Sequence, residues 1–174
     1  PYTVHKDKNG TFSVQGSHAG MEPIHSMRIL QGRGFNETDN SEKRKVAVIG
    51  KRVQAQLFDE DENPIGKNIE VNGISFTVIA VFESLNSGNK QQEEEKIYFP
   101  NETLRYAFNQ LGWIGSFVVM PKPGIHARVA EEETKRYLAE INQVHPEDRG
   151  VFGSFNLQNE YDKIQGLFFG MKFV

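Results

Sequence analysis

Lys67-Asn68-Ile69-Glu70-Val71 and Ile74-Ser75-Phe76-Thr77-Val78 are the two halves of the stretch that decides the fold, and Asn72-Gly73 joins them. Polar and apolar residues alternate along both halves, which is the pattern of strands that bury one face. The Asn-Gly pair favours positive φ at both central positions of a two-residue turn. The stretch therefore predicts a β-hairpin, and its second strand runs on through Ile79-Ala80-Val81-Phe82.

Two other apolar runs predict further strands, each followed by a helix. Val46-Ala47-Val48-Ile49 is a continuous apolar strand that ends at Gly50, and residues 51–58 follow as a short helix. Ile97-Tyr98-Phe99-Pro100 is a short strand that its proline stops. The next residue, Asn101, is a good helix cap, so we expect a helix from there to about residue 109.

The N-terminal part predicts a second hairpin and a helix. Residues 2–5 and 11–14 flank a segment that holds Asn9-Gly10, a turn signal. Residues 21–30 carry apolar side chains at helical spacing, with Pro23 in the first turn and Gly32 after the end.

Two polar stretches, residues 36–45 and 84–96, have little to bury. We expect both to be exposed loops, and the second to be mobile.

From Ser116 the pattern predicts a β-α-β unit. Its parts are a strand at 117–120, an amphipathic helix at 127–144 and a return strand at 151–155. The residues expected to face inward on this helix are Ala130, Thr134, Tyr137, Leu138 and Ile141, and those expected to face outward are Glu131, Glu132, Lys135, Arg136 and Glu140. Residues from Leu157 onward are expected to be helical.

The sequence starts at Pro1 and stops inside the apolar run 164–174. We expect this run to be the entry to a membrane helix of a longer chain, because spanning a bilayer takes about 20 apolar residues. The alternative is a C-terminal helix docked in the domain's own core.

Composition narrows the function classes. The chain has 174 residues, 37% of them hydrophobic, which is enough for a real core. Its net charge of −3 argues against a non-specific nucleic-acid surface. It has no cysteine, so disulfides and thiolate metal sites are excluded.

Catalytic motifs are also missing from the sequence. Gly32-Arg33-Gly34 lacks the third glycine of a dinucleotide fingerprint, and residues 46–52 lack the leading glycine of a phosphate loop. The five histidines fit no metal spacing, and the acidic run 59–62 lacks the central glycine of a calcium loop. We therefore expect no enzyme activity, no metal and no cofactor.

Several of these pieces, taken in order, resemble the extracytoplasmic core domain of MacB-type, FtsX-like ABC transporter permeases. The resemblance covers nearly the whole chain, and it departs from the family at Ala80, where glycine is usual. The matching segments are Val14-Gln15-Gly16, Ile29-Leu30-Gln31-Gly32-Arg33-Gly34-Phe35, Val46-Ala47-Val48-Ile49-Gly50, Leu57-Phe58, Pro64-Ile65-Gly66-Lys67, Ile69 to Gly73, Phe76 to Val81 and Ile97-Tyr98-Phe99-Pro100.

The resemblance implies an α+β fold with two lobes. A porter-like lobe of β-α-β units would comprise residues 1–32 and 113–174, and a smaller mixed α/β lobe, residues 33–112, would be inserted in it. The family implies a non-catalytic domain in the periplasm, tied by flanking helices to the bacterial inner membrane. It would couple ATP hydrolysis, by an ABC ATPase subunit or domain, to efflux, lipoprotein release or mechanotransmission.

Expected partners are that ATPase, a membrane-fusion adaptor or another periplasmic protein, and a second permease in a homo- or heterodimer; no nucleic acid is expected. Loops usually carry binding residues, so the partner contacts we expect lie in the two polar stretches. These contacts are Glu37, Asp39, Glu93, Glu94 and Glu95. The competing interpretation makes the two stretches solvated connectors.

Two other classes of function stay open. One is a periplasmic small-molecule-binding domain, or an enzyme with a non-contiguous site, either of which needs converging polar groups in a pocket. The other is a structural adhesion or scaffold module.

Overall fold

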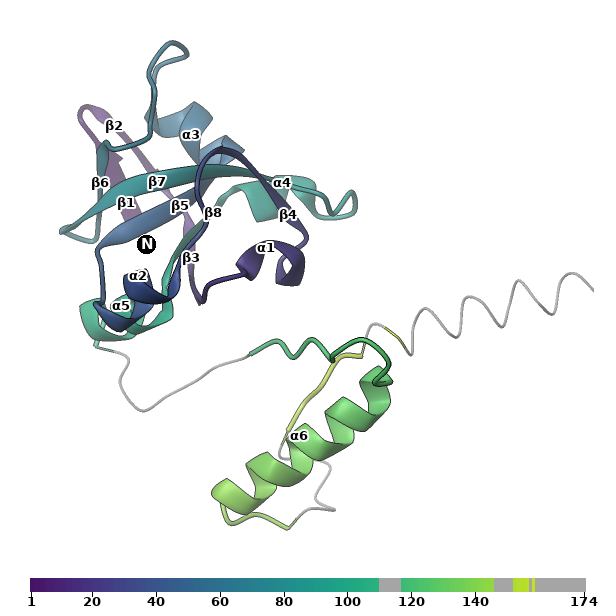
Figure 1. Cartoon of the computed structure of the whole chain (residues 1–174). Coiled ribbons are helices and arrows are strands. Elements are labelled where there is room, and N and C mark those ends of the chain that lie inside the picture. Colours follow the sequence, from purple (N-terminus) through teal and green to yellow (C-terminus); the bar gives the residue numbers. More distant parts are fainter. Residues whose placement is uncertain (110–116, 146–151, 157, 159–174) are drawn as a thin grey trace, which may run out of the picture. The chain divides into compact units, whose positions relative to one another are not determined.

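The computed structural model describes residues 1–109, 117–145, 152–156 and 158. The chain divides into two compact units, residues 1–115 and 116–174. The first unit is built on one sheet, and the second contains a long helix (Figure 1).

The sheet of the first unit has eight strands in the order β2-β1-β6-β7-β5-β8-β3, with β4 paired to β7. The pairs β5–β7 and β3–β8 are parallel and the others are antiparallel. The strands are β1 (Tyr2–His5), β2 (Lys8–Thr11), β3 (Ser13–Ser17), β4 (Met27–Gly32), β5 (Val46–Gly50), β6 (Asn68–Val71), β7 (Ile74–Ser84) and β8 (Lys96–Pro100).

Four short helices lie between these strands, and a fifth follows the last strand. They are α1 (Met21–Ile24), α2 (Glu37–Ser41), α3 (Lys51–Leu57), α4 (Lys90–Glu94) and α5 (Asn101–Ala107). The predicted strands at β5 and β8 and the predicted helices at α3 and α5 are confirmed. Pro100, rather than Asn101, is the N-cap residue of α5.

The hairpin of β6 and β7 lies at the centre of the sheet. Asn72 and Gly73 both have positive φ, 48° and 83°, as a two-residue turn with an Asn-Gly pair requires. The second strand, β7, is 11 residues long and pairs with β4, β5 and β6. The prediction of this hairpin and of its long second strand is confirmed.

Apolar clusters cover both faces of the sheet, which explains the continuous apolar runs of β5 and β8. Ala47 and Ile49 belong to the cluster that includes α3, whereas Val48 belongs to the cluster that includes Met21 of α1. Ile97 and Phe99 likewise face the first cluster and Tyr98 the second. A strand buried on both faces has no need of polar alternation.

A register shift in β7 moves its side chains from one cluster to the other. Phe76 and Val78 face the first cluster, but Ala80 and Phe82 face the second. The pairing with β5 skips Ile79, which makes it the extra residue of a β-bulge.

Gly32 lies where β4 passes this bulge. Its φ is +80°, and an added Cβ would lie 1.9 Å from the carbonyl oxygen of Ile79. Arg33 N–H donates to the same oxygen at 3.1 Å. The glycine is therefore required both by the backbone angle and by the close approach. It ends a strand, not the helix that the sequence predicted.

The N-terminal prediction was right about a hairpin and wrong about its turn. β1 and β2 turn at Lys6 and Asp7, and Gly10 lies inside β2, opposite Thr3. The predicted helix at residues 21–30 is also wrong beyond its first turn. Ser26 takes a positive φ, and the chain then enters β4, where pairing with β7 outweighs the local helical spacing.

Both predicted loops contain a short helix, α2 in residues 36–45 and α4 in residues 84–96. The expectation of irregular structure was therefore wrong at these helices.

Strand pairing crosses the lobe boundary that the sequence analysis expects between residues 32 and 33. Strands β1, β3 and β4 from residues 1–32 pair with β6, β8 and β7 from residues 33–112. The first 32 residues therefore belong to the same unit as the rest of the sheet, and the division of the chain follows residue 115.

The second unit contains α6 (Ala127–Ile141), as predicted. The predicted strand at 117–120 is not formed, and its four side chains are exposed. Among the described residues, 152–156 form no strand either. Tyr137 and Ile141, expected to face inward, are exposed, while Glu131 is largely covered. The helix expected from Leu157 onward lies outside the described residues, apart from Gln158.

Within the part of the chain that the structure describes, every helix is too short or too polar to span a bilayer.

Candidate functional site

The five predicted partner contacts have very different surroundings. Asp39 and Glu94 are buried, at 0% and 5% exposure, so a partner cannot reach them and these two predictions are wrong. Glu37 and Glu95 are exposed and Glu93 is half-buried. For these three residues, a partner contact stays a prediction.

Asp39 is buried because it closes the first turn of α2. Asn36 is the N-cap, and its Oδ1 accepts from the Asp39 N–H at 2.9 Å. Asp39 Oδ2 accepts in return from the Asn36 N–H at 3.0 Å, which completes a capping box. This reciprocal pair lets a short polar segment form a helix.

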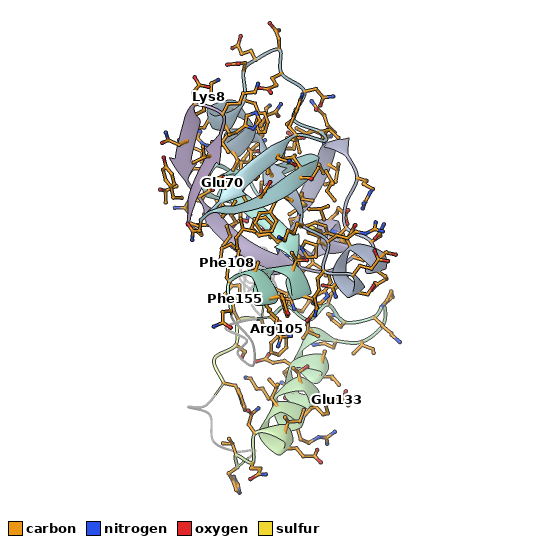
Figure 2. The ribbon with its side chains drawn as sticks, turned by 90° about the vertical axis from the view of Figure 1, so that its left-hand side faces the viewer. Lys8, Glu70, Arg105, Phe108, Glu133 and Phe155 are labelled. Carbon is orange, nitrogen blue, oxygen red and sulfur yellow. The ribbon has the colours of Figure 1, made fainter. Side chains whose placement is uncertain are left out.

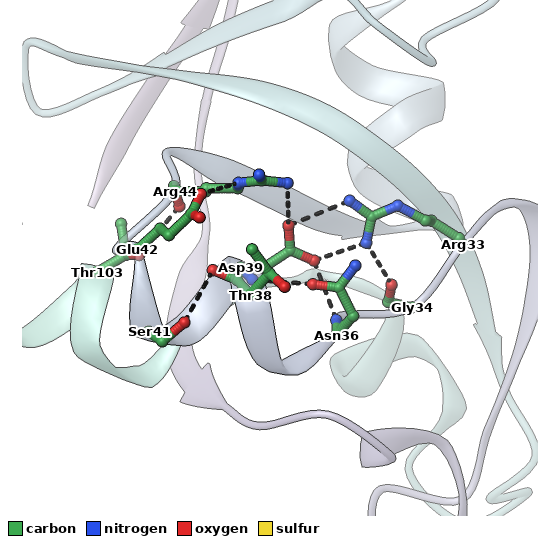
Figure 3. Close-up of polar contacts among 9 residues, drawn as sticks. All are labelled: Arg33, Gly34, Asn36, Thr38, Asp39, Ser41, Glu42, Arg44 and Thr103. Carbon is green, nitrogen blue, oxygen red and sulfur yellow. Dashed lines mark hydrogen bonds and ion pairs between the residues drawn. The ribbon is translucent and has the colours of Figure 1, made fainter.

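Two arginines meet the other side of the Asp39 carboxylate (Figure 3). Arg33 donates from both terminal nitrogens, at 2.6 Å to Oδ2 and 3.1 Å to Oδ1. Arg44 Nη1 lies 3.7 Å from Oδ1. The bond from Arg33, followed by the Asn36 backbone bond and the charges of both arginines, lowers the pKa of Asp39 despite its burial.

Further contacts fasten α2 to the neighbouring elements. Asn40 Oδ1 accepts from the N–H of Glu102 at 3.1 Å, and Thr103 Oγ1 donates to the Arg44 carbonyl at 2.9 Å. The Lys43 ammonium lies 4.4 Å from the centre of the Tyr106 ring, a cation–π contact. The helix α2 therefore bridges the end of β4, the start of β5 and α5.

The end of α5 is held by aromatic packing. Phe108 follows this helix, near Arg105 in Figure 2, and its ring lies 6.4 Å from the rings of both Phe76 and Phe99. The last described turn of the first unit is thereby tied to the central strands β7 and β8.

A second polar cluster surrounds α4. Glu94 Oε1 accepts from the Ser84 N–H at 3.2 Å and lies 3.7 Å from Lys90 Nζ. An added Cβ on Gly50 would lie 2.1 Å from the Glu94 carbonyl oxygen, so the helix packs directly against the end of β5.

The neighbouring acidic side chains are paired. Glu93 Oε1 lies 2.7 Å from Lys96 Nζ, and Glu95 Oε1 lies 2.9 Å from Arg52 Nε. These pairs reduce the acidic character on which the predicted contacts rested.

Two other carboxylates anchor segments far apart in sequence. Glu62 lies 2.7 Å from Lys6 Nζ and 3.2 Å from His5 Nε2, and the Lys6 bond is the main cause that lowers its pKa to about 2. These contacts fasten the turn end of the β1–β2 hairpin, where Lys8 is labelled in Figure 2. In the second unit, Glu131 accepts from Lys135, Ser154 and Asn156, which lower its pKa to about 2 and hold residues 154–156 on α6.

The arrangement around Asp39 is the structured feature that sequence reasoning missed. The signal was present as Asn36-x-x-Asp39, the spacing of a capping box, between two arginines. The residues described here position charges and hold neighbouring elements of the fold together.

Comparison with known proteins agrees with this geometry. Residues 1–137 match the family described as MacB-like periplasmic core domain. A macrolide export ATP-binding/permease protein MacB from Bdellovibrio bacteriovorus is 26% identical over 161 residues, 92% of this chain and 24% of the relative. The corresponding protein of Chlorobium phaeobacteroides is 32% identical over 157 residues, 90% of this chain and 23% of the relative. The chain therefore spans about a quarter of the length of these relatives.

A solved structure has the same fold. The periplasmic region of MacB from Actinobacillus actinomycetemcomitans superposes with a TM-score of 0.71 at 21% identity, covering 94% of this chain and 71% of that one. The expected α+β fold is confirmed.

Proposed function

The chain belongs to the family of MacB-like periplasmic core domains, and from this premise we propose that it is a non-catalytic coupling element of an ABC transporter permease. In this proposal, ATP hydrolysis elsewhere in the permease moves the domain, and the domain passes the motion to a partner or cargo outside the cytoplasm. The permease resides in the bacterial inner membrane, with this domain in the periplasm.

The observation that carries the proposal is the packing of the first unit. Its sheet has a buried apolar cluster on each face, and the aromatic contacts of Phe108 fix the chain just where it leaves the sheet. Close-packed interiors deform little, so a displacement applied there moves the unit as a rigid body. Coupling by a moving body needs this stiffness and no catalytic group.

The names of the relatives favour export over the other expected roles. Both are named as macrolide export proteins that combine ATP-binding and permease parts. By analogy we propose an ATPase domain or subunit, a second permease copy and a periplasmic adaptor as the working partners. We also propose that the second unit, with its helix α6, is part of the porter-like lobe.

The test separates coupling from hydrolysis in the full-length permease. Asp39→Ala removes the carboxylate that holds α2, so we expect export to fall while ATP hydrolysis continues. Asp61→Ala, a change of the same charge at an exposed turn position, is the matched control and should leave both unchanged.

A catalytic or nucleotide-binding role predicts something different for the isolated chain. Calorimetric titration with ATP and magnesium should give no binding heat, and micromolar binding would refute the non-catalytic proposal.

A further inference from the structure

The surface formed by Arg33, Lys43, Arg44 and Tyr106 has an excess of positive charge that its own fold holds in place. Two guanidinium groups share the single buried carboxylate of Asp39. Arg33 and Arg44 remain 48% and 45% exposed, although Asp39 itself is fully covered. Glu42 also pairs with Arg44, so Arg33, Lys43 and Arg44 carry three positive charges against the two carboxylates of Asp39 and Glu42, and one positive charge of this surface is not balanced.

Both arginines have unused donors. Arg33 uses its terminal nitrogens on Asp39 and on the Gly34 carbonyl, at 3.0 Å. Arg44 uses Nε on Glu42, at 2.9 Å, and Nη1 points toward Asp39. Among the described residues, nothing accepts from Arg33 Nε or Arg44 Nη2. Guanidinium groups bind carboxylates in a planar two-point geometry. Because contacts within the folded domain already orient both groups, binding would cost little further side-chain entropy.

An aromatic side chain lies next to the arginines. Tyr106 is 65% exposed, and Lys43 lies across its ring at 4.4 Å. Lys43 directly precedes Arg44 in the chain, so the ring and the arginine belong to one continuous surface. Arginine and tyrosine are the residue types that dominate binding energy at protein interfaces, above all when their side chains are held before binding.

We propose that this surface docks an acidic segment of an extracytoplasmic protein, with carboxylates on Arg33 and Arg44 and an apolar contact on Tyr106. The occupant follows from charge complementarity, and the exposed ring favours a protein over a simple anion. The inference rests on the proposed function, since it names the chemistry of the partner. It reverses the expectation from sequence, which placed acidic side chains of this domain at the contact.

The test titrates the isotope-labelled 174-residue chain with an oligoglutamate peptide at low salt and follows NMR shifts. We expect the Nε signals of Arg33 and Arg44 to move. Arg44→Gln should weaken binding about three- to tenfold, the range for a partly exposed charge-assisted pair. Arg52→Gln is the matched control, because Arg52 is also half-exposed and ion-paired but lies on α3. It should bind like the unchanged chain.

Lys43→Gln gives a second measurement in case Arg44→Gln unfolds, and it should weaken binding in the same direction. The proposal is overturned if oligoglutamate does not bind, if Arg52→Gln loses as much affinity as Arg44→Gln, or if inorganic phosphate binds as tightly as the peptide. Arg44-dependent binding to anionic lipid vesicles in place of the peptide would also overturn it. None of these outcomes involves ATP coupling, so they leave the proposed function to its own test.

Discussion

Asp39 illustrates how one side chain can be hidden from solvent and still determine a surface. Its carboxylate accepts hydrogen bonds from the Asn36 amide and from both terminal nitrogens of Arg33, and Arg44 lies nearby. A buried carboxylate is tolerated only when it is paired and hydrogen-bonded in this way. The exposed charges of Arg33 and Arg44 are therefore positioned by a residue that is itself inaccessible.

Removing this carboxylate should destabilise the domain. We expect Asp39→Ala to lower the free energy of unfolding by about 2 kcal/mol, because it removes the reciprocal cap of α2 and the charge-assisted bonds from Arg33. Chemical denaturation of the isolated chain measures the change, with Asp61→Ala as the control. A loss no larger than that of the control would contradict the account.

The same carboxylate sets a pH dependence. Its folded-state pKa is lowered, so its contribution is fully present above the unfolded value of about 3.9 and is lost as pH falls through the folded value. The difference in stability between the unchanged chain and Asp39→Asn should therefore shrink only in acid, below about pH 4. Unfolding curves across acidic pH test this, and a difference that is constant down to the lowest pH would contradict it.

Gly32 tests the β-bulge at Ile79. We expect Gly32→Ala to cost at least about 2 kcal/mol, from the positive φ together with the clash against the Ile79 carbonyl. Gly66→Ala is the matched control, since Gly66 has a φ of +81° but open space around its missing Cβ. Equal losses in the two variants would mean that the close approach to Ile79 contributes nothing.

At the scale of elements, the sequence predicted correctly those strands and turns whose conformation depends on neighbouring residues alone. The Asn72-Gly73 turn fixes its hairpin without help, so that hairpin was predictable. The segment 27–32 has apolar residues at helical spacing, but it lies beside β7 and pairs with that strand. This pairing depends on residues far away in the sequence, so the segment itself does not predict it. The strand expected at 117–120 has no neighbouring strand among the described residues, so its apolar pattern produces no pairing.

At the candidate site too, some features could be predicted from neighbouring residues and others could not. The exposure of Glu37 and Glu95 follows from their polar neighbourhood, whereas the burial of Asp39 depends on arginines that the fold brings to it.

The element α4 gives a prediction about local dynamics. Glu94 accepts the Ser84 amide, so we expect Glu94→Ala to speed hydrogen exchange at Ser84 and leave the amides of Phe76 and Val78 slow. Glu95→Ala, whose side chain is exposed, is the control. Unchanged exchange at Ser84 would show that the contact does not restrain this end of β7.

At the scale of the whole molecule, the first unit contains everything it needs to fold. All eight strands and both apolar clusters lie within residues 1–109. We therefore expect a chain truncated after residue 115 to unfold cooperatively, with a melting temperature within a few degrees of that of the first transition of the full chain. Calorimetry makes the comparison, and a truncated chain without a cooperative transition would contradict the division into units.

The unpaired edge of β4 is relevant to aggregation of the domain at high protein concentration. Among the described residues β4 pairs only with β7, which leaves one row of its backbone groups open to another strand. Unpaired edges of this kind invite sheet-to-sheet aggregation. Here Leu30 is an extra residue that breaks the register, and Arg28, bonded to Glu83, sets a charge beside the opening. A bulge and a charge at an edge strand are two features that disfavour its pairing with a further strand, and β4 has both.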